Sequence, residues 1–297
     1  MTSIESTKNR RAVLLLHGLC SSSLEVRLFA RTLRDHGFHV VTPTLSGYSA
    51  PEAGSTAENT VADYRRWIAD TCVEIDRLTE TFAEVALCGV SLGATLALAV
   101  AAERPYALTG LSLISTTLFF DGWNVSRWRF MLPVLYHTPL GKWYRYREIP
   151  PYGVKNLRVR AWISDQLSRG PLSSAGAATI PTPSLREAER LIRQVKQSLS
   201  QVRTPVLMIH AREDDVASLA NVNFVRSRIG SDLFREVIVD DSYHMITLDN
   251  DRELAALKTV QFLTASAQWR EQSWLQISSW AELAEHRHST TSRSQSA

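Results

Sequence analysis

Ser91 is the residue of this sequence whose neighbours most clearly indicate chemistry. It stands at the centre of Gly-Val-Ser-Leu-Gly, residues 89–93. Residues 85–88 before it are apolar and typical of a buried strand, and the alanine-rich run after it predicts a helix ending near Pro105. A strand that turns directly into a helix strains its central residue and leaves room only for small residues two positions away on either side. The pattern predicts a nucleophilic serine; the alternative is a tight turn without chemistry.

Two further side chains follow predicted strands, as a serine nucleophile requires. An aspartate, Asp214 or its neighbour Asp215, comes after the apolar run at 205–211, and His244 comes after the last predicted strand. Loops that follow parallel strands meet at one edge of a sheet, so both side chains can approach Ser91. A histidine removes the serine proton and an aspartate orients the histidine, here in the chain order Ser, Asp, His.

Backbone amides complete the predicted catalytic site. The N–H of Leu92 begins the helix, where amide groups are free to donate to an anion. Leu19 follows a predicted strand that ends in His17-Gly18, and its N–H supplies a second donor. Both would stabilise the oxyanion that forms when Ser91 attacks a carbonyl group. This chemistry requires no cofactor, and the spacing of His, Cys and Asp predicts no metal site.

The motifs together resemble those of the α/β-hydrolase superfamily, and within it the branch of carboxylesterases and monoacylglycerol lipases. The resemblance covers about residues 11–117 and 203–262. It implies an α/β fold, with a mostly parallel central sheet flanked by helices and an inserted helical cap. The resembled motif also selects Asp214 rather than Asp215 as the acid. The motifs that carry the resemblance are at 17–19, 43–48, 89–93, 210–215 and 242–249.

The sequence departs from the family pattern at two positions beside the expected pocket. Ser46-Gly47-Tyr48 stands where the family usually has Gly-His-Gly, and Tyr243 replaces the glycine that usually precedes the catalytic histidine. Neither change alters a catalytic side chain. Both can reshape the pocket rim, so the resemblance does not predict the substrate.

Three functions remain open from the sequence. The first is hydrolysis of carboxylic esters with moderately lipophilic acyl groups, through an acyl-enzyme on Ser91. The second is a thioesterase or acyltransferase that acts on a carrier-bound acyl thioester. The third is a non-catalytic ligand receptor, which the intact set of Ser91, Asp214 and His244 disfavours.

Changes in pattern along the chain predict its organisation. Residues 1–117 and 201–266 form the expected hydrolase core, and residues 118–200 form the cap insertion. Within the cap, a stretch rich in Gly, Pro, Ser and Ala predicts a mobile loop over 168–184, followed by a helix over 185–200.

The C-terminal part of the chain lies beyond the resemblance. Residues 267–285 predict one extra amphipathic helix, which could pack on the core, on a second subunit or on a membrane. Residues 286–297 are dominated by polar residues, and we expect disorder there.

The first half of the cap combines aromatic and basic side chains. Trp123 and Trp128 are the candidates for contact with the substrate acyl group. In the alternative interpretation, the rings only pack the cap onto the core and the basic residues face solvent. If the aromatic side chains instead line an acyl pocket, we expect the basic outer face of the cap to meet an anionic membrane or an acidic acyl carrier.

Composition restricts the remaining possibilities. A chain of 297 residues with 44% hydrophobic content can form one large α/β domain. A net charge of +3 is too small to indicate nucleic-acid binding. The first residues do not resemble a secretory signal, no apolar run is long enough to span a membrane, and three scattered cysteines predict free thiols. We therefore expect a cytoplasmic enzyme with a small acyl substrate; the oligomeric state stays open.

Overall fold

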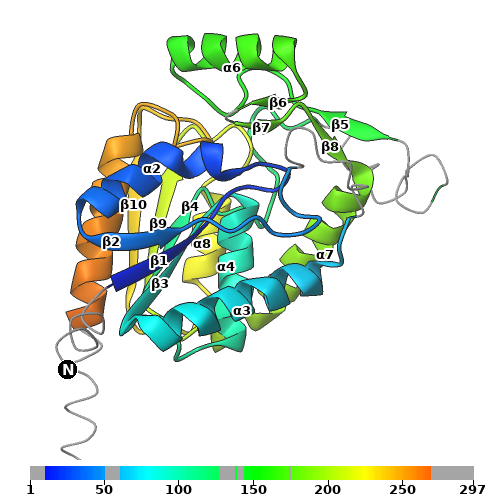
Figure 1. Ribbon diagram of the computed structural model, residues 1–297. Helices are drawn as coiled ribbons and strands as arrows, with labels where there is room; N and C mark the ends of the chain where they lie inside the picture. The colour runs from blue at the N-terminus through cyan, green and yellow to red at the C-terminus, as the bar shows by residue number, and fades with distance from the viewer. Residues whose placement is uncertain (1–10, 51–60, 127–137, 139–143, 174, 269–297) are drawn as a thin grey trace, which may run out of the picture.

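A parallel sheet forms the centre of the computed structural model, which describes residues 11–50, 61–126, 138, 144–173 and 175–268. The sheet has six strands in the order β10-β9-β4-β3-β1-β2 (Figure 1). All neighbouring strands in it are parallel, which confirms the expected α/β architecture. The strands are β1 (Arg11–Leu16), β2 (Phe38–Val41), β3 (Glu84–Val90), β4 (Leu111–Ile114), β9 (Val206–Ala211) and β10 (Phe234–Val239).

The central strands are nearly continuous apolar runs because both faces of the sheet are covered. Almost every residue of β1, β3, β4 and β9 is buried. Successive side chains of a strand point to opposite faces. Leu14 therefore packs in one core cluster, whereas Val13 and Leu15 pack in the other. Two apolar layers, one on each face, hold the sheet and fix where its strands end.

Helices supply the partners for both layers (Figure 1). Helix α4 is the most buried of them, because it lies between the sheet and two other helices. One face of the sheet is covered by α3 (Tyr64–Thr81), α4 (Leu92–Glu103), α7 (Thr182–Ser198) and α8 (Ala220–Arg226). The other face is covered by α2 (Ser23–Asp35) and a helix over 252–268.

Helix α7 packs on the core, although the sequence assigns its residues to the cap. Ala188, Leu191, Ile192 and Val195 are buried in the same cluster as residues of α3 and α4. These four positions share one helix face, and burial of that face stabilises α7 against the core. The part of the insertion that rises above the sheet therefore ends before α7, not at residue 200.

The rest of the insertion lies over the carboxyl ends of the strands (Figure 1). Strand β5 pairs with β8, and β6 pairs with β7, both in antiparallel orientation. The continuous loop expected over 168–184 is not found, because three short strands and the ends of two helices occupy most of this stretch. The elements are β5 (Arg145–Arg147), α6 (Leu157–Arg169), β6 (Leu172–Ser173), β7 (Gly176–Ala177) and β8 (Thr179–Pro181).

Several expectations lie outside the described residues. These are the extra helix over 267–285, apart from its first two residues, the tail over 286–297 and the position of Trp128. Within the described ranges, no helix has the length and apolar character needed to cross a membrane.

Candidate active site

Ser91 lies in the turn between β3 and α4, where the sequence predicted it. Its backbone φ of 55° falls in the left-handed region that residues other than glycine rarely adopt. A Cβ atom at Gly89 would overlap the backbone of Gly93, and one at Gly93 would overlap the carbonyl group of His17. Close packing of this turn therefore explains why both positions are glycine.

His244 joins Ser91 to Asp214. The Nε2 atom of His244 lies 2.8 Å from Ser91 Oγ, and Nδ1 lies 2.9 Å from each carboxylate oxygen of Asp214. The three residues follow β3, β9 and β10, so the ends of three parallel strands bring them together. Such a chain of contacts lets a histidine accept a proton from a serine while a carboxylate holds the ring.

The two adjacent aspartates have different partners. Asp214 accepts hydrogen bonds from the amides of Val216 and Ala217, at 2.9 and 2.7 Å, besides facing the His244 ring. Asp215 instead accepts from the backbone amide of His244, at 3.3 Å. The imidazole therefore faces Asp214, and Asp215 holds the backbone of the same residue.

Electrostatic interaction between His244 and Asp214 shifts both pKa values in the direction that base catalysis needs. Burial is the largest effect and opposes the charged form of His244, but the charge and hydrogen bond of Asp214, together with the charges of Asp215 and Glu25, outweigh it and raise the pKa of His244. Burial also opposes ionisation of Asp214, yet the charge and hydrogen bond of His244 hold its pKa below the ordinary value. With Asp214 ionised, Nδ1 keeps its proton and donates to it, so the Nε2 lone pair of neutral His244 faces Ser91.

A second histidine contacts the same carboxylate. His210 Nε2 lies 3.3 Å from Asp214 Oδ2 and 2.6 Å from the carbonyl oxygen of Ala217. Burial lowers the pKa of His210, so the ring is neutral near pH 7 and its Nε2–H donates. This second contact to Asp214 Oδ2 restricts the rotation of the carboxylate.

Leu19 and Leu92, the predicted oxyanion donors, both line the cavity that contains Ser91 and His244. Among the described residues, neither amide donates to a backbone or side-chain acceptor. The turn at Leu19 is held by the amide of Gly18, which donates to Glu25 Oε2 at 2.9 Å. Two residues of one cavity whose N–H groups have no other acceptor match what an oxyanion requires.

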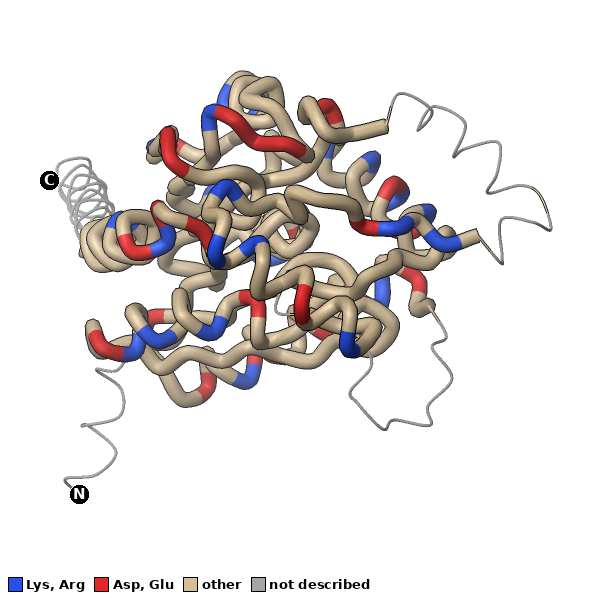
Figure 2. Tube along the Cα trace, turned by 90° about the horizontal axis from the view of Figure 1, so that it is seen from above, with Lys and Arg blue, Asp and Glu red and all other residues tan. Residues whose placement is uncertain are grey.

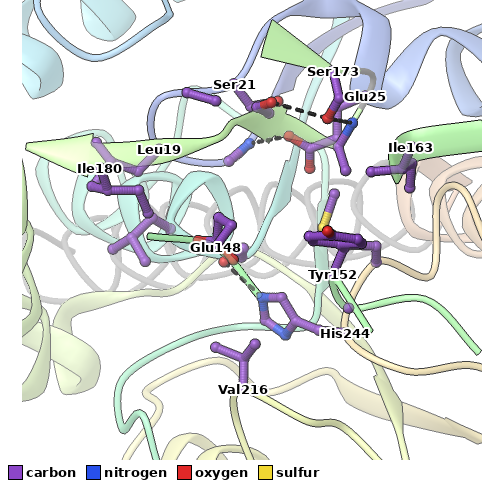
Figure 3. A pocket seen from close by; sticks show the side chains of 18 of the residues that line it. Leu19, Ser21, Glu25, Glu148, Tyr152, Ile163, Ser173, Ile180, Val216 and His244 are labelled. Carbon is purple, nitrogen blue, oxygen red and sulfur yellow. Dashed lines mark hydrogen bonds between the residues drawn. The ribbon is translucent and has the colours of Figure 1, made fainter. Parts of the chain in front are cut away.

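The cavity has a volume of about 120 Å³. Its apolar lining comes largely from the cap, through Ile163 of α6 and Ile180 of β8 (Figure 3). Met245, next to His244, lines it from the core. The cap therefore covers the serine and limits the space in which an acyl group can lie.

Trp123 lies outside this cavity, contrary to expectation. Its ring is 59% exposed and packs edge-on against Tyr243, with centroids 5.3 Å apart. Its Nε1–H donates to the carbonyl of Glu213, at 3.0 Å. These contacts turn the indole toward the outer rim, so the predicted contact with the acyl group is not made. The other tryptophan of that prediction, Trp128, is not among the described residues.

Three polar residues near Ser91 were missed by sequence reasoning. Thr117 Oγ1 lies 3.3 Å from Ser91 Oγ, and Glu25 and Glu148 line the cavity. Glu25 could have been found from the sequence, because it shares the buried face of α2 with Phe29, where an apolar residue is expected. Glu148 follows the short strand β5 in the insertion, where no hydrophobic period marks buried positions.

The loop that carries His244 is bonded to the cap. Asp249 accepts from the amides of Lys155, Asn156 and Tyr243, at 2.6, 2.9 and 3.0 Å. The segment that leads into α6 and the loop that carries the histidine therefore share one buried carboxylate. No group of three His, Cys, Asp or Glu in the described part of the chain could hold a metal ion.

Comparison with known proteins gives consistent matches. The chain matches the family described as serine aminopeptidase, S33, over residues 7–251. It is 21% identical over 253 residues to a carboxylesterase from Bacillus subtilis (strain 168), covering 85% of this chain and 92% of that protein. It is 24% identical over 255 residues to a thermostable monoacylglycerol lipase from Bacillus sp. (strain H-257), covering 86% and 91%.

A solved structure also resembles the chain. It comes from work on LipS and LipT, two metagenome-derived lipolytic enzymes, and superposes with a TM-score of 0.71 at 24% identity. The superposition covers 87% of this chain and 95% of that one. At this level of identity, the likeness establishes the fold.

Proposed function

Because the chain belongs to the family described as serine aminopeptidase, S33, and has an α/β-hydrolase fold, we propose that it hydrolyses carboxylic esters with Ser91 as nucleophile. The observation that carries this proposal is the 2.8 Å contact between Ser91 Oγ and His244 Nε2 beside a covered cavity. The names of two relatives, a carboxylesterase and a monoacylglycerol lipase, favour an ester as the substrate.

In the first half of the proposed reaction, Ser91 Oγ attacks the acyl carbonyl carbon while its proton passes to His244 Nε2. Asp214 holds the ring and stabilises the imidazolium that results. The bond between the carbonyl carbon and the alcohol oxygen then breaks, and His244 returns the proton to that oxygen. The products are a free alcohol and an acyl group on Ser91.

Water completes the cycle by the same steps. His244 accepts a proton from the water that attacks the acyl-enzyme, and returns it to Ser91 Oγ as the acid leaves. In both halves the carbonyl oxygen becomes an anion, and the amides of Leu19 and Leu92 are the proposed donors to it. Their lack of another acceptor among the described residues supports this role.

The acyl group is proposed to be moderately lipophilic. Ile163, Leu167 and Ile180 of the cap provide an apolar wall, and Val216 and Leu185 add to it. Burial of each methylene group against such a wall contributes up to ~0.8 kcal/mol to transition-state binding. A cavity of about 120 Å³ sets an upper limit on chain length.

A thioester remains the alternative substrate, because the same nucleophile and oxyanion donors also act on an acyl thioester. A basic cap would suit the acidic carrier of such a thioester, and contact of the same face with an anionic membrane is proposed for either substrate. Basic and acidic residues are interspersed along the described trace (Figure 2). Many of the cap residues on which that contact depends lie in 127–137 and 139–143, outside the described ranges.

The experiment that tests the proposal compares p-nitrophenyl hexanoate with the matching hexanoyl thioester in the wild type and in Ser91→Ala. We expect the ester to have the higher kcat/KM and Ser91→Ala to lower it by on the order of 10⁴-fold or more. Ser168→Ala, an exposed serine of α6, is the matched control and should retain wild-type rates. A higher kcat/KM for the thioester would favour a thioesterase instead. A Ser91→Ala variant that keeps several per cent of the activity would show that Ser91 is not the nucleophile.

A further inference from the structure

The cavity beside Ser91 carries negative charge that the proposed mechanism does not use. Glu25 and Glu148 both line it, and no lysine or arginine is among its described lining residues. A second cavity of about 90 Å³ continues past Glu148. It is also bordered by Asp215 and, among the described residues, by no basic side chain.

The two cavities share six lining residues, and Glu148 is the charged one among them. Its backbone amide donates to the carbonyl of Ala178 at 3.0 Å, which fixes its position after β5. Its side chain reaches into the same space as His244 (Figure 3) and is closely surrounded by protein atoms. Within the described part of the chain, no donor bonds to its carboxylate, and the one positive charge that acts on it is that of protonated His244. A carboxylate enclosed in this way is stabilised by a ligand that supplies positive charge.

The neighbours of Glu148 do not neutralise it at the pH of catalysis. Burial raises the pKa of Glu148 to about 7; the charge of Asp215 acts in the same direction, and protonated His244 opposes it. Burial similarly raises the pKa of Glu25 to about 7. The proposed base, His244, works only when it is neutral. At pH 8, above both of these pKa values, the two carboxylates are mostly ionised, and in the form that accepts the Ser91 proton His244 carries no positive charge.

The place of Glu148 near His244 indicates which part of the substrate meets its negative charge. His244 returns its proton to the leaving oxygen, so the alcohol part of an ester lies on the His244 side of the reacting carbon. Glu148 interacts electrostatically with His244 and with Asp215. The aromatic residues Phe120 and Tyr146 border the second cavity as well, and ring faces attract alkylammonium groups.

We infer that the cavity between Glu148 and Asp215 binds an ammonium group carried by the alcohol part of the substrate. This inference rests on the proposed ester hydrolysis at Ser91, because that reaction defines the alcohol side. Esters whose alcohol carries a carboxylate or a phosphate are disfavoured by the same charges. The chemical class of the substrate is thus an ester of an amino alcohol.

The test is a pair of esters that differ in charge and share one shape. Butyrylcholine carries a quaternary nitrogen where 3,3-dimethylbutyl butyrate carries a carbon. Their dissociation constants are measured by calorimetry at pH 8 on Ser91→Ala, which leaves both esters intact. We expect butyrylcholine to bind at least ~10-fold more tightly, since one close charge pair of this kind is sufficient for that ratio.

Glu148→Gln in the same Ser91→Ala background keeps the side-chain shape and removes the charge. The ratio of the two dissociation constants should then fall to within about twofold of one. Glu80→Gln, an exposed glutamate of α3, is the matched control and should keep the full ratio. Circular dichroism of each variant verifies that it is folded.

Equal affinities in Ser91→Ala, no measurable binding of butyrylcholine, or a preference that survives Glu148→Gln would each overturn the inference. Hydrolysis of p-nitrophenyl butyrate by the wild type is measured in parallel. If that ester is hydrolysed and the charge preference is absent, the ammonium site fails and the proposed function stands. If it is not hydrolysed, the proposed function fails, and the calorimetry still reports on the cation site.

Discussion

The imidazole of His244 presents Nδ1 to Asp214 at 2.9 Å from both carboxylate oxygens. The next residue, Asp215, reaches only the backbone amide of His244. Two neighbouring aspartates in one loop therefore have separate tasks, and only the first can fix the tautomer of the ring. This division leads directly to a test by substitution.

Asp214→Asn should lower kcat for p-nitrophenyl esters by on the order of 10³–10⁴-fold, because an amide stabilises the wrong tautomer of His244. Asp215→Asn should lower it by less than ~10-fold, since that side chain does not contact the ring. Steady-state kinetics of the two purified variants measures both effects. The reverse order would assign the acid role to Asp215.

The pH dependence of kcat/KM follows from the direction of the His244 shift. His244 must be neutral to accept the Ser91 proton, so activity is lost as the pH falls through its pKa. Since Asp214 raises that pKa above the ordinary 6.5, the rising limb should be centred above 6.5. In Asp214→Asn the limb should move to lower pH. A wild-type limb centred well below 6.5 would contradict the coupling between Asp214 and His244. Because Glu148 titrates close to His244, the apparent pKa read from the limb belongs to the coupled pair rather than to His244 alone.

Glu25 makes stability depend on pH in a defined direction. Its pKa in the folded protein is raised to about 7 from 4.5 by burial, so the folded state holds its proton more tightly than the unfolded state does. The stability contributed by the protonated carboxyl is complete below pH 4.5 and is lost as pH rises through 7. The unfolding free energy of Glu25→Gln, measured relative to the wild type, should therefore rise by up to ~3 kcal/mol from pH 5 to pH 8.5.

Urea unfolding of wild type, Glu25→Gln and Glu80→Gln at the two pH values measures this gain. The exposed Glu80 serves as the control, and its substitution should change stability equally at both pH values. A Glu25→Gln effect that is the same at pH 5 and pH 8.5 would show that Glu25 does not titrate in this range.

The turn at Ser91 should not tolerate a methyl group. In Gly93→Ala the new Cβ would overlap the backbone carbonyl groups of His17 and Leu16, so we expect a loss of ~1–3 kcal/mol or more in unfolding free energy. Gly170→Ala is the matched control, because no atom lies within 4 Å of its added Cβ. Thermal unfolding of both variants compares them, and equal midpoints would contradict the packing argument.

Acyl-chain preference should depend on Ile163 and not on Trp123. We expect kcat/KM for p-nitrophenyl esters to rise from acetate to about hexanoate or octanoate, by up to about fourfold per methylene, and then to level off. Ile163→Ala should flatten this profile, because the side chain is buried and lines the cavity. Trp123→Ala should leave the profile unchanged, since its ring lies at the outer rim. A profile that peaks at acetate would remove the lipophilic acyl group from the proposal.

The fold was predictable because its signals are local. Buried parallel strands are short apolar runs, and the glycines around Ser91 are required by one turn. The order of strand ends then predicted that Asp214 and His244 would meet Ser91, and the structure brings them together. The resemblance to α/β-hydrolases of the carboxylesterase and monoacylglycerol-lipase branch is confirmed by the family match and the relatives.

What the sequence could not supply depends on contacts between distant segments. Glu148 lines the cavity because the insertion folds over His244, and no periodic pattern in the insertion marks that position. Trp123 was expected in the pocket because aromatic rings favour apolar sites, yet its indole N–H donates to the carbonyl of Glu213 at the rim. Helix α7 was assigned to the cap by its place in the chain, whereas its apolar face decides that it packs on the core.

The measurement that tests the central claim most directly is the mass of the protein after reaction with a fluorophosphonate. The account predicts one covalent adduct, on the peptide that contains Ser91, and its formation should slow by on the order of 10³-fold or more in His244→Ala. Ser91→Ala should carry no adduct under the same conditions. An adduct on any other residue, or a wild-type protein that stays unmodified, would contradict the assignment of Ser91 as the nucleophile.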